Sequence, residues 1–247
     1  MKRLLALVGV GALAATAVVL PIGSSGAGTP TADASVYLVH GIPGVTVDVC
    51  VAGSTTPLAE DFEPGTTAGP VDVPAGTYEI DLKAPGDNCD GAVIYDQNVD
   101  IPAGSSTVVA WGTANEPVLT SFTNDVSCTQ PGTGRITARH VASAAGPVNV
   151  LANDVVAFAN LAPGTQQVLD GPVATYTVEV QLVSDDTTVL GPAPIPVQEG
   201  KNILVHVVNQ LEEGSDLQPA SAIPLILDVG VCETPVAPVE TAPSFTG

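Results

Sequence analysis

Basic residues are scarce in this 247-residue chain, which has 6 Lys and Arg against 26 Asp and Glu and a formal net charge of −20. After Arg3 the basic residues are Lys83, Arg135, Arg139 and Lys201. Nucleic-acid binding depends on clustered cations that neutralise phosphates, and an anionic membrane surface repels an acidic protein. We therefore expect neither nucleic acid nor an anionic membrane surface to be a partner.

Aromatic residues and catalytic motifs are also rare. The chain has one Trp, four Tyr and four Phe, which weakens any prediction of a sugar-binding cleft. It contains no GxSxG, HExxH, P-loop or GxGxxG pattern. Trp111 lies in an apolar strand pattern, and we interpret it as a core residue. We expect a protein that is not an enzyme and has no cofactor, with a carboxylate-dependent hydrolase as the remote alternative.

The N-terminus has the layout of a secretory signal peptide. Lys2 and Arg3 precede an apolar run, Leu4–Leu20, and small residues then offer cleavage after Ala27 or after Ala34. The competing interpretation is an uncleaved membrane anchor, for which this run is short. No second apolar run of spanning length follows. We expect a secreted or envelope-associated protein without stable membrane insertion after signal cleavage.

The cysteines are few and even in number. Cys50, Cys89, Cys128 and Cys232 lack the CxxC spacing of zinc sites. In an exported chain, four cysteines predict two disulfides, and the sequence leaves three pairings open. We favour Cys50–Cys89 within the first half of the chain and Cys128–Cys232 around the second half.

Three blocks of sequence recur in the same order, which indicates a tandem duplication. The repeats align Val36–Gly53 with Ile136–Asp154, Glu63–Leu82 with Ala162–Leu182, and Asp100–Gly112 with Pro196–Val208.

The duplication predicts two domains of similar size. We expect a signal peptide at 1–34, a first β-sandwich at 35–123, a linker at 124–134, a second β-sandwich at 135–232 and a flexible, Pro-rich tail at 233–247.

Almost all hydrophobic periodicity has period two. Tyr78, Ile80 and Leu82 share one face of a strand, and acidic or basic residues alternate with them. Gly and Pro interrupt every longer window, so no helix is predicted in the mature chain. Short strands with turn signals between them predict an all-β fold of two tandem Ig-like or transthyretin-like sandwiches.

A turn with the sequence Pro-Ala-Gly-Thr-Tyr precedes one of these strands. Pro74 cannot donate a ladder hydrogen bond, and Gly76 can adopt a positive φ. We therefore expect a corner at which the chain enters the next strand. Tyr78 and its counterpart Tyr176 fall on the apolar face, where the hydroxyl can reach a backbone group.

These features resemble a known family. Each repeat has a first strand ending in His, then Val-Asp-Val or Val-Asn-Val, a Pro-Gly turn, the tyrosine corner and a turn into a last apolar strand. This combination is similar to the DUF4397 domain of exported bacterial proteins, often found in tandem. The resemblance implies an Ig-like sandwich and an exported protein, and it implies no activity.

Two histidines occupy equivalent places in the repeats. His40 and His140 fall on the apolar face at the end of the first strand of each repeat. One interpretation makes them metal ligands, and the other makes them structural residues that hydrogen-bond the turn that follows. We favour the structural role, because equivalent positions in two domains cannot share one metal. The third histidine, His206, has no partner in the pattern.

The best candidate for a metal site is an acidic loop. Asp87, Asn88 and Asp90 surround Cys89, and calcium binds several oxygen ligands from such loops. The loop lacks the spacing of an EF-hand, and we favour a solvated loop on an acidic surface. The function we expect is a non-catalytic, exported structural or interaction module with an unknown envelope or extracellular partner. The alternative is a module that binds a small ligand or calcium.

Overall fold

The computed structural model describes residues 33–209 and 220–233 of the chain. Within this part, one 3-10 turn at Asp87–Cys89 is the only helical element. No helix in these two segments is long and apolar enough to span a bilayer. Residues 1–32 of the predicted signal peptide and 234–247 of the predicted tail lie outside the described residues.

The first repeat folds into eight strands, most of them rich in β-branched residues. In chain order they are β1 (Asp33–His40), β2 (Val47–Val51), β3 (Ala59–Phe62), β4 (Thr67–Pro74), β5 (Gly76–Lys83), β6 (Val93–Ile101), β7 (Gly104–Gly112) and β8 (Pro117–Thr123).

The second repeat folds into a matching set of eight strands. They are β9 (Thr133–Val141), β10 (Val148–Ala152), β11 (Val155–Leu161), β12 (Thr165–Pro172), β13 (Ala174–Leu182), β14 (Thr188–Val197), β15 (Lys201–Asn209) and β16 (Ala220–Asp228).

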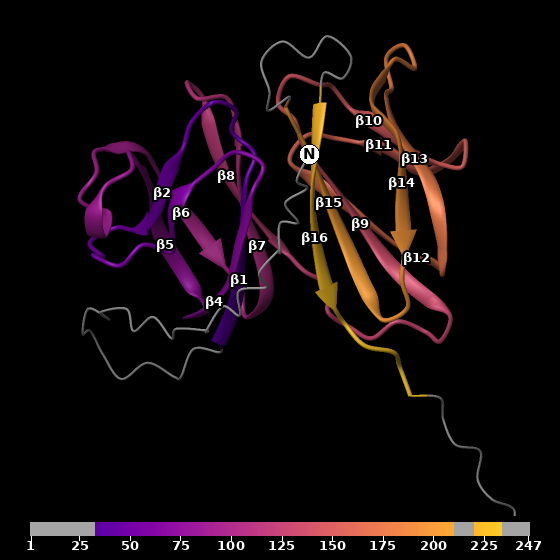
Figure 1. Ribbon diagram of the computed structural model, residues 1–247, viewed down its shortest axis with the longest axis horizontal. Coiled ribbons are helices and arrows are strands. Elements are labelled where there is room, and N and C mark those ends of the chain that lie inside the picture. The colour runs from indigo at the N-terminus through magenta and orange to yellow at the C-terminus, as the bar shows by residue number, and fades with distance from the viewer. Residues whose placement is uncertain (1–32, 210–219, 234–247) are drawn as a thin grey trace, which may run out of the picture.

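The strands form four sheets of four strands each, two in each repeat (Figure 1). In the first repeat the orders are β4-β1-β7-β8 and β3-β2-β5-β6, and in the second they are β12-β9-β15-β16 and β11-β10-β13-β14. Each strand of the second repeat thus occupies the place of its counterpart in the first. The pairs β1–β7 and β9–β15 are parallel. The predicted all-β fold of sandwich domains is confirmed.

Each sandwich has its own core between its two sheets. Side chains alternate across a strand, so every second residue points inward. In β1, Val36 and Leu38 are buried between the sheets, and in β15 the inward residue Val207 occupies the second core. The outward residues of the same strands are therefore available for other contacts.

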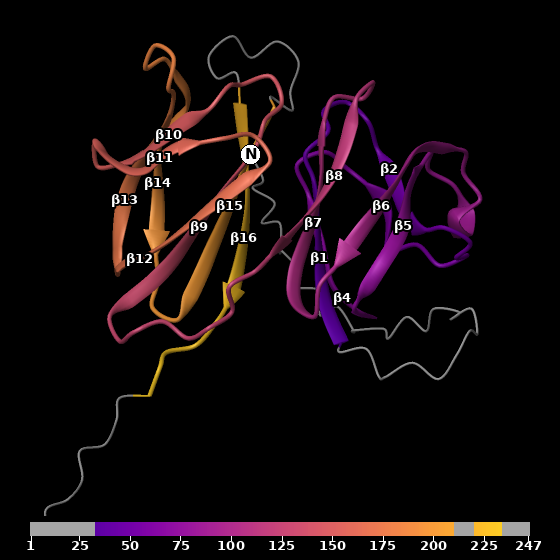
Figure 2. The same cartoon turned by 180° about the vertical axis from the view of Figure 1, so that it is seen from behind.

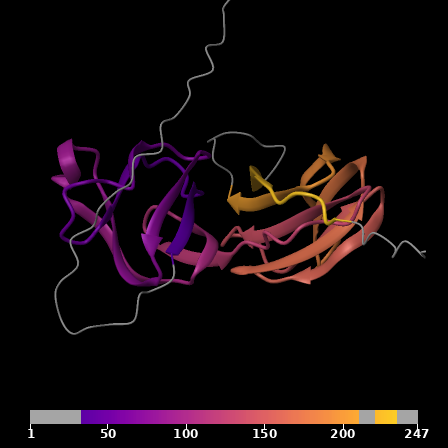
Figure 3. The same ribbon diagram turned by 90° about the horizontal axis from the view of Figure 1, so that it is seen from below.

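Those outward residues join the two sandwiches, which lie side by side (Figures 2 and 3). The sheet β4-β1-β7-β8 packs its outer face against the outer face of β12-β9-β15-β16. We call the buried set between them the junction cluster. Its members are Val39, Val109 and Phe122 of the first sandwich and Val141, Val208 and Ile223 of the second.

The segment between the sandwiches is shorter than the linker expected at 124–134. The strand β8 ends at Thr123 and β9 begins at Thr133. Thr133 and Gly134 belong to β9 because they pair with Pro172 and Gly171 of β12. At the other end of the first sandwich, β1 begins at Asp33, two residues before the expected start at Ser35.

Candidate functional site

Both disulfides favoured from the sequence are present. Cys50 of β2 is bonded to Cys89, which closes a loop of the first sandwich. Cys128 of the linker is bonded to Cys232, 104 positions later. Disulfides persist in oxidising compartments, so the two bonds are typical of a protein in an oxidising or extracellular environment.

The histidines at the ends of β1 and β9 make the same contacts in the two sandwiches. His40 Nε2 lies 2.7 Å from the Val45 carbonyl oxygen and donates to it, while Nδ1 accepts from the Ile42 N–H at 3.3 Å. His140 Nε2 donates to the Gly146 carbonyl oxygen at 2.9 Å. Burial lowers the pKa of both histidines, against the opposing effect of these hydrogen bonds. Their ring nitrogens are thus engaged with the turn that follows.

The tyrosines of the two corners also make equivalent contacts. Tyr78 Oη donates to the Pro74 carbonyl oxygen at 2.6 Å, and Tyr176 Oη donates to the Pro172 carbonyl oxygen at 3.0 Å. Each hydroxyl therefore ties the start of a strand to the end of the preceding one.

The glycine of this corner does not use the positive φ that is open to it. Gly76 is absent from the residues with positive φ and begins β5 in pairing with Ile101. A Cβ placed there would lie 4.0 Å from the Tyr78 ring, which is an ordinary contact. The second repeat has Ala174 at this place because the corner does not require glycine.

In the acidic loop proposed for calcium, a lysine side chain of the protein already binds one of the loop oxygens. Lys83 Nζ donates to the Cys89 carbonyl oxygen at 2.9 Å, so this oxygen already faces a positive charge. Asn88 and Asp90 are exposed. Within the described residues, no group of three or more His, Cys, Asp or Glu side chains lies close enough to hold a metal. Nothing in this geometry favours calcium over the solvated loop.

The junction between the sandwiches contains Trp111, which was expected in a sandwich core. Its ring instead packs against the junction cluster from the outer face of β7. The indole Nε1 donates to Thr120 Oγ1 at 2.9 Å. Trp111 has the opposite parity to the inward residue Ala110, so its side chain emerges on the other face of the sheet.

A buried arginine is the main polar residue of the junction. Arg139 of β9 is fully buried and lies over the Phe122 ring, with 4.9 Å from Cζ to the ring centroid. Its Nη2 donates to Asn124 Oδ1 at 2.7 Å and its Nε to Gln166 Oε1 at 2.9 Å. In the part of the chain that the structure describes, Arg139 forms no ion pair with a carboxylate. Neutral hydrogen-bond acceptors and the face of an aromatic ring therefore stabilise the positive charge of the Arg139 guanidinium.

His206 of β15 completes this network. Arg139 Nη1 donates to His206 Nε2 at 3.0 Å, and His206 Nδ1 donates to the Ile223 carbonyl oxygen at 3.0 Å. Burial, and then the Arg139 charge, lower the pKa of His206 to about 3. Burial lowers the pKa of Arg139 to about 9, so at neutral pH the arginine is charged and the histidine is neutral.

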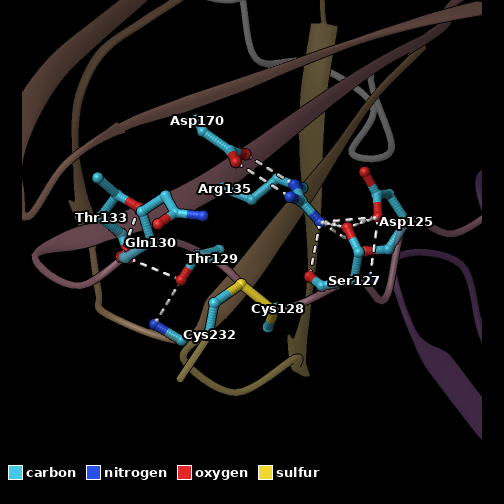
Figure 4. The surroundings of a disulfide bond; sticks show 10 residues. Asp125, Ser127, Cys128, Thr129, Gln130, Thr133, Arg135, Asp170 and Cys232 are labelled. Atoms are coloured by element: carbon cyan, nitrogen blue, oxygen red, sulfur yellow. Dashed lines mark hydrogen bonds and ion pairs between the residues drawn. A yellow bond between two sulfur atoms is a disulfide. The ribbon is translucent and has the colours of Figure 1, made fainter. Parts of the chain in front are cut away.

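A second arginine of β9 anchors the linker (Figure 4). The Arg135 guanidinium makes two hydrogen bonds to Asp170, with Nε–Oδ1 2.7 Å and Nη2–Oδ2 3.0 Å. On its other side, Nη1 lies 2.8 Å from Asp125 Oδ1 and donates to the Ser127 carbonyl oxygen at 2.9 Å. The hydrogen bond to Asp170 is the main reason that the pKa of Arg135 is raised. The linker is therefore fixed to the outer face of the second sandwich.

An apolar cavity lies inside the second sandwich. Its volume is about 270 Å³, and all eight strands β9–β16 contribute to its wall. Ala138 and Ala152 face it from opposite sheets, and Phe158 and Tyr176 also line it. Leu169 lines the cavity and is 45% exposed, so the cavity reaches the surface near the edge strand β12.

Neither the cavity nor the Arg139 network was anticipated from the sequence. A signal for the network was present, because Arg135 and Arg139 alternate with the apolar residues Ile136 and Ala138 and so must leave the core. The alignment of the two repeats also places Ala138 opposite Leu38. The smaller side chain leaves more space at this place in the second core, but the sequence does not give the volume between the two sheets.

Taken together, these features define a disulfide-bonded protein built from two β-sandwiches. Residues 34–151 match the family model described as "Domain of unknown function (DUF4397)". The chain therefore contains a DUF4397 domain, and the family resemblance is confirmed for this segment. The match covers the first sandwich and continues through β9 and most of β10. No curated protein matches the chain.

Proposed function

We propose that this is a non-catalytic, exported bacterial protein that acts as a rigid structural or interaction module in the cell envelope or the extracellular space. The observation that carries the proposal is the junction. The junction cluster buries apolar side chains of both sandwiches, and Arg139 donates across it to Asn124. Two modules joined in this way present their other faces to a partner at one fixed separation, whereas linked domains without a buried interface move independently.

Two features support export. The disulfides are typical of proteins in oxidising compartments, and the N-terminal sequence is typical of a secretory signal peptide. We propose that cleavage follows Ala27. Cleavage after Ala34 would remove two residues of β1, and Ala34 is buried and pairs with Val73 and Gly104.

The contacts of the polar groups support a non-catalytic role. His40 and His206 use both ring nitrogens in hydrogen bonds within the fold. Asp48 is 1% exposed, and its two carboxylate oxygens accept from the backbone N–H groups of Asp61 and Gly86. These residues stabilise loops of the protein, which gives the carboxylate-dependent hydrolase no support.

The basic residues support the exclusion of nucleic acid as a partner. Each one after the predicted signal peptide is engaged within the fold, so it is not free to neutralise phosphates. Lys83 binds the Cys89 carbonyl oxygen, Arg135 pairs with Asp125 and Asp170, Arg139 is buried in the junction, and Lys201 pairs with Asp228.

Fractionation of the native cells tests the proposal. We expect the wild-type protein in the envelope fraction or the medium, with both disulfides found by non-reducing peptide mapping. Val208→Asp places a charge in the junction cluster and should open it, which small-angle scattering measures as a larger radius of gyration. Envelope retention, or cross-linking to a partner in the medium, should then fall. Val155→Asp is the control, because Val155 is 69% exposed.

Three outcomes would contradict the proposal. Protein found in the cytoplasm with reduced cysteines would exclude export. Full retention of partner cross-linking by Val208→Asp, together with an opened junction, would show that a rigid pair is not needed. Hydrolytic activity that one point substitution abolishes would exclude a non-catalytic role.

A second candidate function is a small-ligand-binding module. One observation favours it, namely the apolar cavity of about 270 Å³ in the second sandwich. This function is compatible with the first, because the cavity lies within one sandwich and the junction lies on its outer face.

A further inference from the structure

The cavity of the second sandwich has a counterpart in the first that is almost filled. The corresponding space between β1, β2, β4 and β5 is about 20 Å³. The strands that line this small space, namely β1, β2, β4, β5, β6 and β7, have counterparts in the same strand order among those that line the larger cavity, so the backbone architecture alone does not create that cavity. The side chains that project into it must therefore differ.

The strand registers identify three of these side chains. Leu38 pairs with Val108, and Ala138 pairs with Val205 at the equivalent place. Val51 lies opposite Ile80, as Ala152 lies opposite Val178. At all three places the second sandwich has the smaller residue. In the second sandwich, Ala138 takes the place of Leu38, Ala152 that of Val51 and Gly171 that of Val73.

Some exchanges run in the opposite direction but do not close the space. Ala59 of the first sandwich corresponds to Phe158, since they pair with the equivalent residues Val49 and Val150. Phe158 nevertheless forms part of the cavity wall. Protein interiors are normally packed as densely as organic crystals. An unfilled volume of this size in one of two equivalent cores points to a ligand.

The wall of the cavity determines the chemistry of that ligand. The Tyr176 hydroxyl is engaged with the Pro172 carbonyl oxygen, and the Asp170 carboxylate is held by Arg135. The rest of the wall is aliphatic or aromatic, with Leu190 and Ile195 of β14 among its members. A charged group or a peptide backbone placed there would bury polar atoms without partners, which is unfavourable. A neutral hydrocarbon has no such groups.

We propose that the second sandwich binds a small, neutral, apolar molecule, or the hydrocarbon part of one, between its two sheets. The inference deepens the second candidate function and rests on it. Apolar cavities of roughly 150 Å³ stay dry and accept benzene, so the cavity of about 270 Å³ accepts a larger hydrocarbon group. The ligand enters beside Leu169, which lines the cavity and is also exposed.

Titration with the neutral fluorescent dye phenylnaphthylamine tests the proposal on the disulfide-bonded protein. We expect saturable binding of one dye per chain and a rise in melting temperature. The double variant Ala138→Leu and Ala152→Val gives this wall the residues of the first sandwich and should weaken dye binding at least tenfold. Val36→Ile, which adds a methyl group to the filled core, is the matched control and should bind as the wild type does.

A second, smaller variant keeps the test decisive if the double variant does not fold. Gly171→Ala adds one carbon to the cavity wall, in ordinary contact with Tyr176 Oη at 3.7 Å, and should weaken binding at least threefold. Anilinonaphthalene sulfonate, an anionic probe of similar size, should bind more weakly than the neutral dye.

Three results would overturn the inference: no saturable dye binding by the wild type, wild-type affinity in the filled variants, or tighter binding of the anionic probe. Absence of dye binding by the wild-type protein, together with its normal retention in the envelope, would overturn this inference and leave the proposed structural or interaction role in place.

Discussion

The two sandwiches have the same strand order, yet their cores and their outer faces have diverged in different ways. Leu38 fills the first core at the place where Ala138 leaves a cavity in the second. On the outer faces the difference is one of polarity, since Val39 and Val109 of the first sandwich correspond to Arg139 and His206 of the second. A duplicated fold can thus keep its strand order while one core is filled and the other retains a cavity.

The junction shows why the outer faces diverged together. Val39 and Val109 contribute apolar surface, and Arg139 needs hydrogen-bond acceptors that a purely apolar partner would not provide. Asn124, at the start of the linker, supplies one of them and is itself held by Thr107 Oγ1 at 2.9 Å. The linker therefore completes the interface that it spans.

The largest expected effect on stability comes from removing the disulfides, and its size should differ between the two bonds. Replacing Cys50 and Cys89 with Ala should lower the free energy of unfolding by roughly 4 kcal/mol, and replacing Cys128 and Cys232 should lower it by roughly 5 kcal/mol, because the second pair closes the longer loop. The sequence separations are 39 and 104. Urea unfolding of both variants beside the wild type measures this difference. A larger loss from the first pair would contradict the chain-entropy argument.

The cores should respond in opposite directions to exchange of their residues. Leu38→Ala should lower the free energy of unfolding by about 3 kcal/mol, because it opens a cavity in a filled core. Ala138→Leu should raise it by about 1 kcal/mol, because it fills an existing one. Thermal and urea unfolding without added ligand measure both changes. Destabilisation by Ala138→Leu as well would mean that the second core has no room for the added carbons.

Acid should weaken the second sandwich through His206. Its pKa is about 3 in the folded protein, against an ordinary value of 6.5. As the pH falls below 6.5, the unfolded chain takes up the proton first, so the stabilisation is complete above pH 6.5 and is lost as the pH falls. Between pH 6.5 and pH 4 the loss should reach about 3 kcal/mol.

His206→Val is the control for this pH effect, because it introduces the residue found at Val109 in the first sandwich. Urea unfolding from pH 7 to pH 4 should give a smaller pH slope for the variant than for the wild type. Equal slopes would show that the pKa of His206 is not lowered in the folded protein.

The smallest expected effect compares the two tyrosine corners. Tyr78→Phe should lower the free energy of unfolding by about 1 kcal/mol and Tyr176→Phe by about 0.5 kcal/mol, as expected for single neutral hydrogen bonds. The hydroxyl–oxygen distance is 2.6 Å at Tyr78 and 3.0 Å at Tyr176, and Tyr176 lines the cavity. Urea unfolding measures both, and a larger loss at Tyr176 would reverse the comparison.

Several parts of the molecule could be predicted because they depend on local chemistry. Alternation in stretches such as Tyr78–Leu82 is a property of neighbouring residues, so it indicated strands and their inward faces. Gly76 and Trp111 show the limit of this reasoning. A Pro-Ala-Gly sequence is compatible with several turns, and the φ of Gly76 was decided by its pairing with Ile101. An apolar strand residue was assigned to a core, but a second sandwich covers the outer face at Trp111.

The sequence by itself determined the strand pattern, the duplication and a set of cysteines for which two disulfides were expected, because these follow from residue periodicity, internal similarity and composition. Only the tertiary structure decided that Arg139 and His206 lie together in the junction and that Ala138 borders a cavity. Each of these properties depends on residues that are distant in sequence. A cavity is the volume that opposing side chains fail to fill, and a buried charge is defined by the groups that surround it. Neither can be read from one strand at a time.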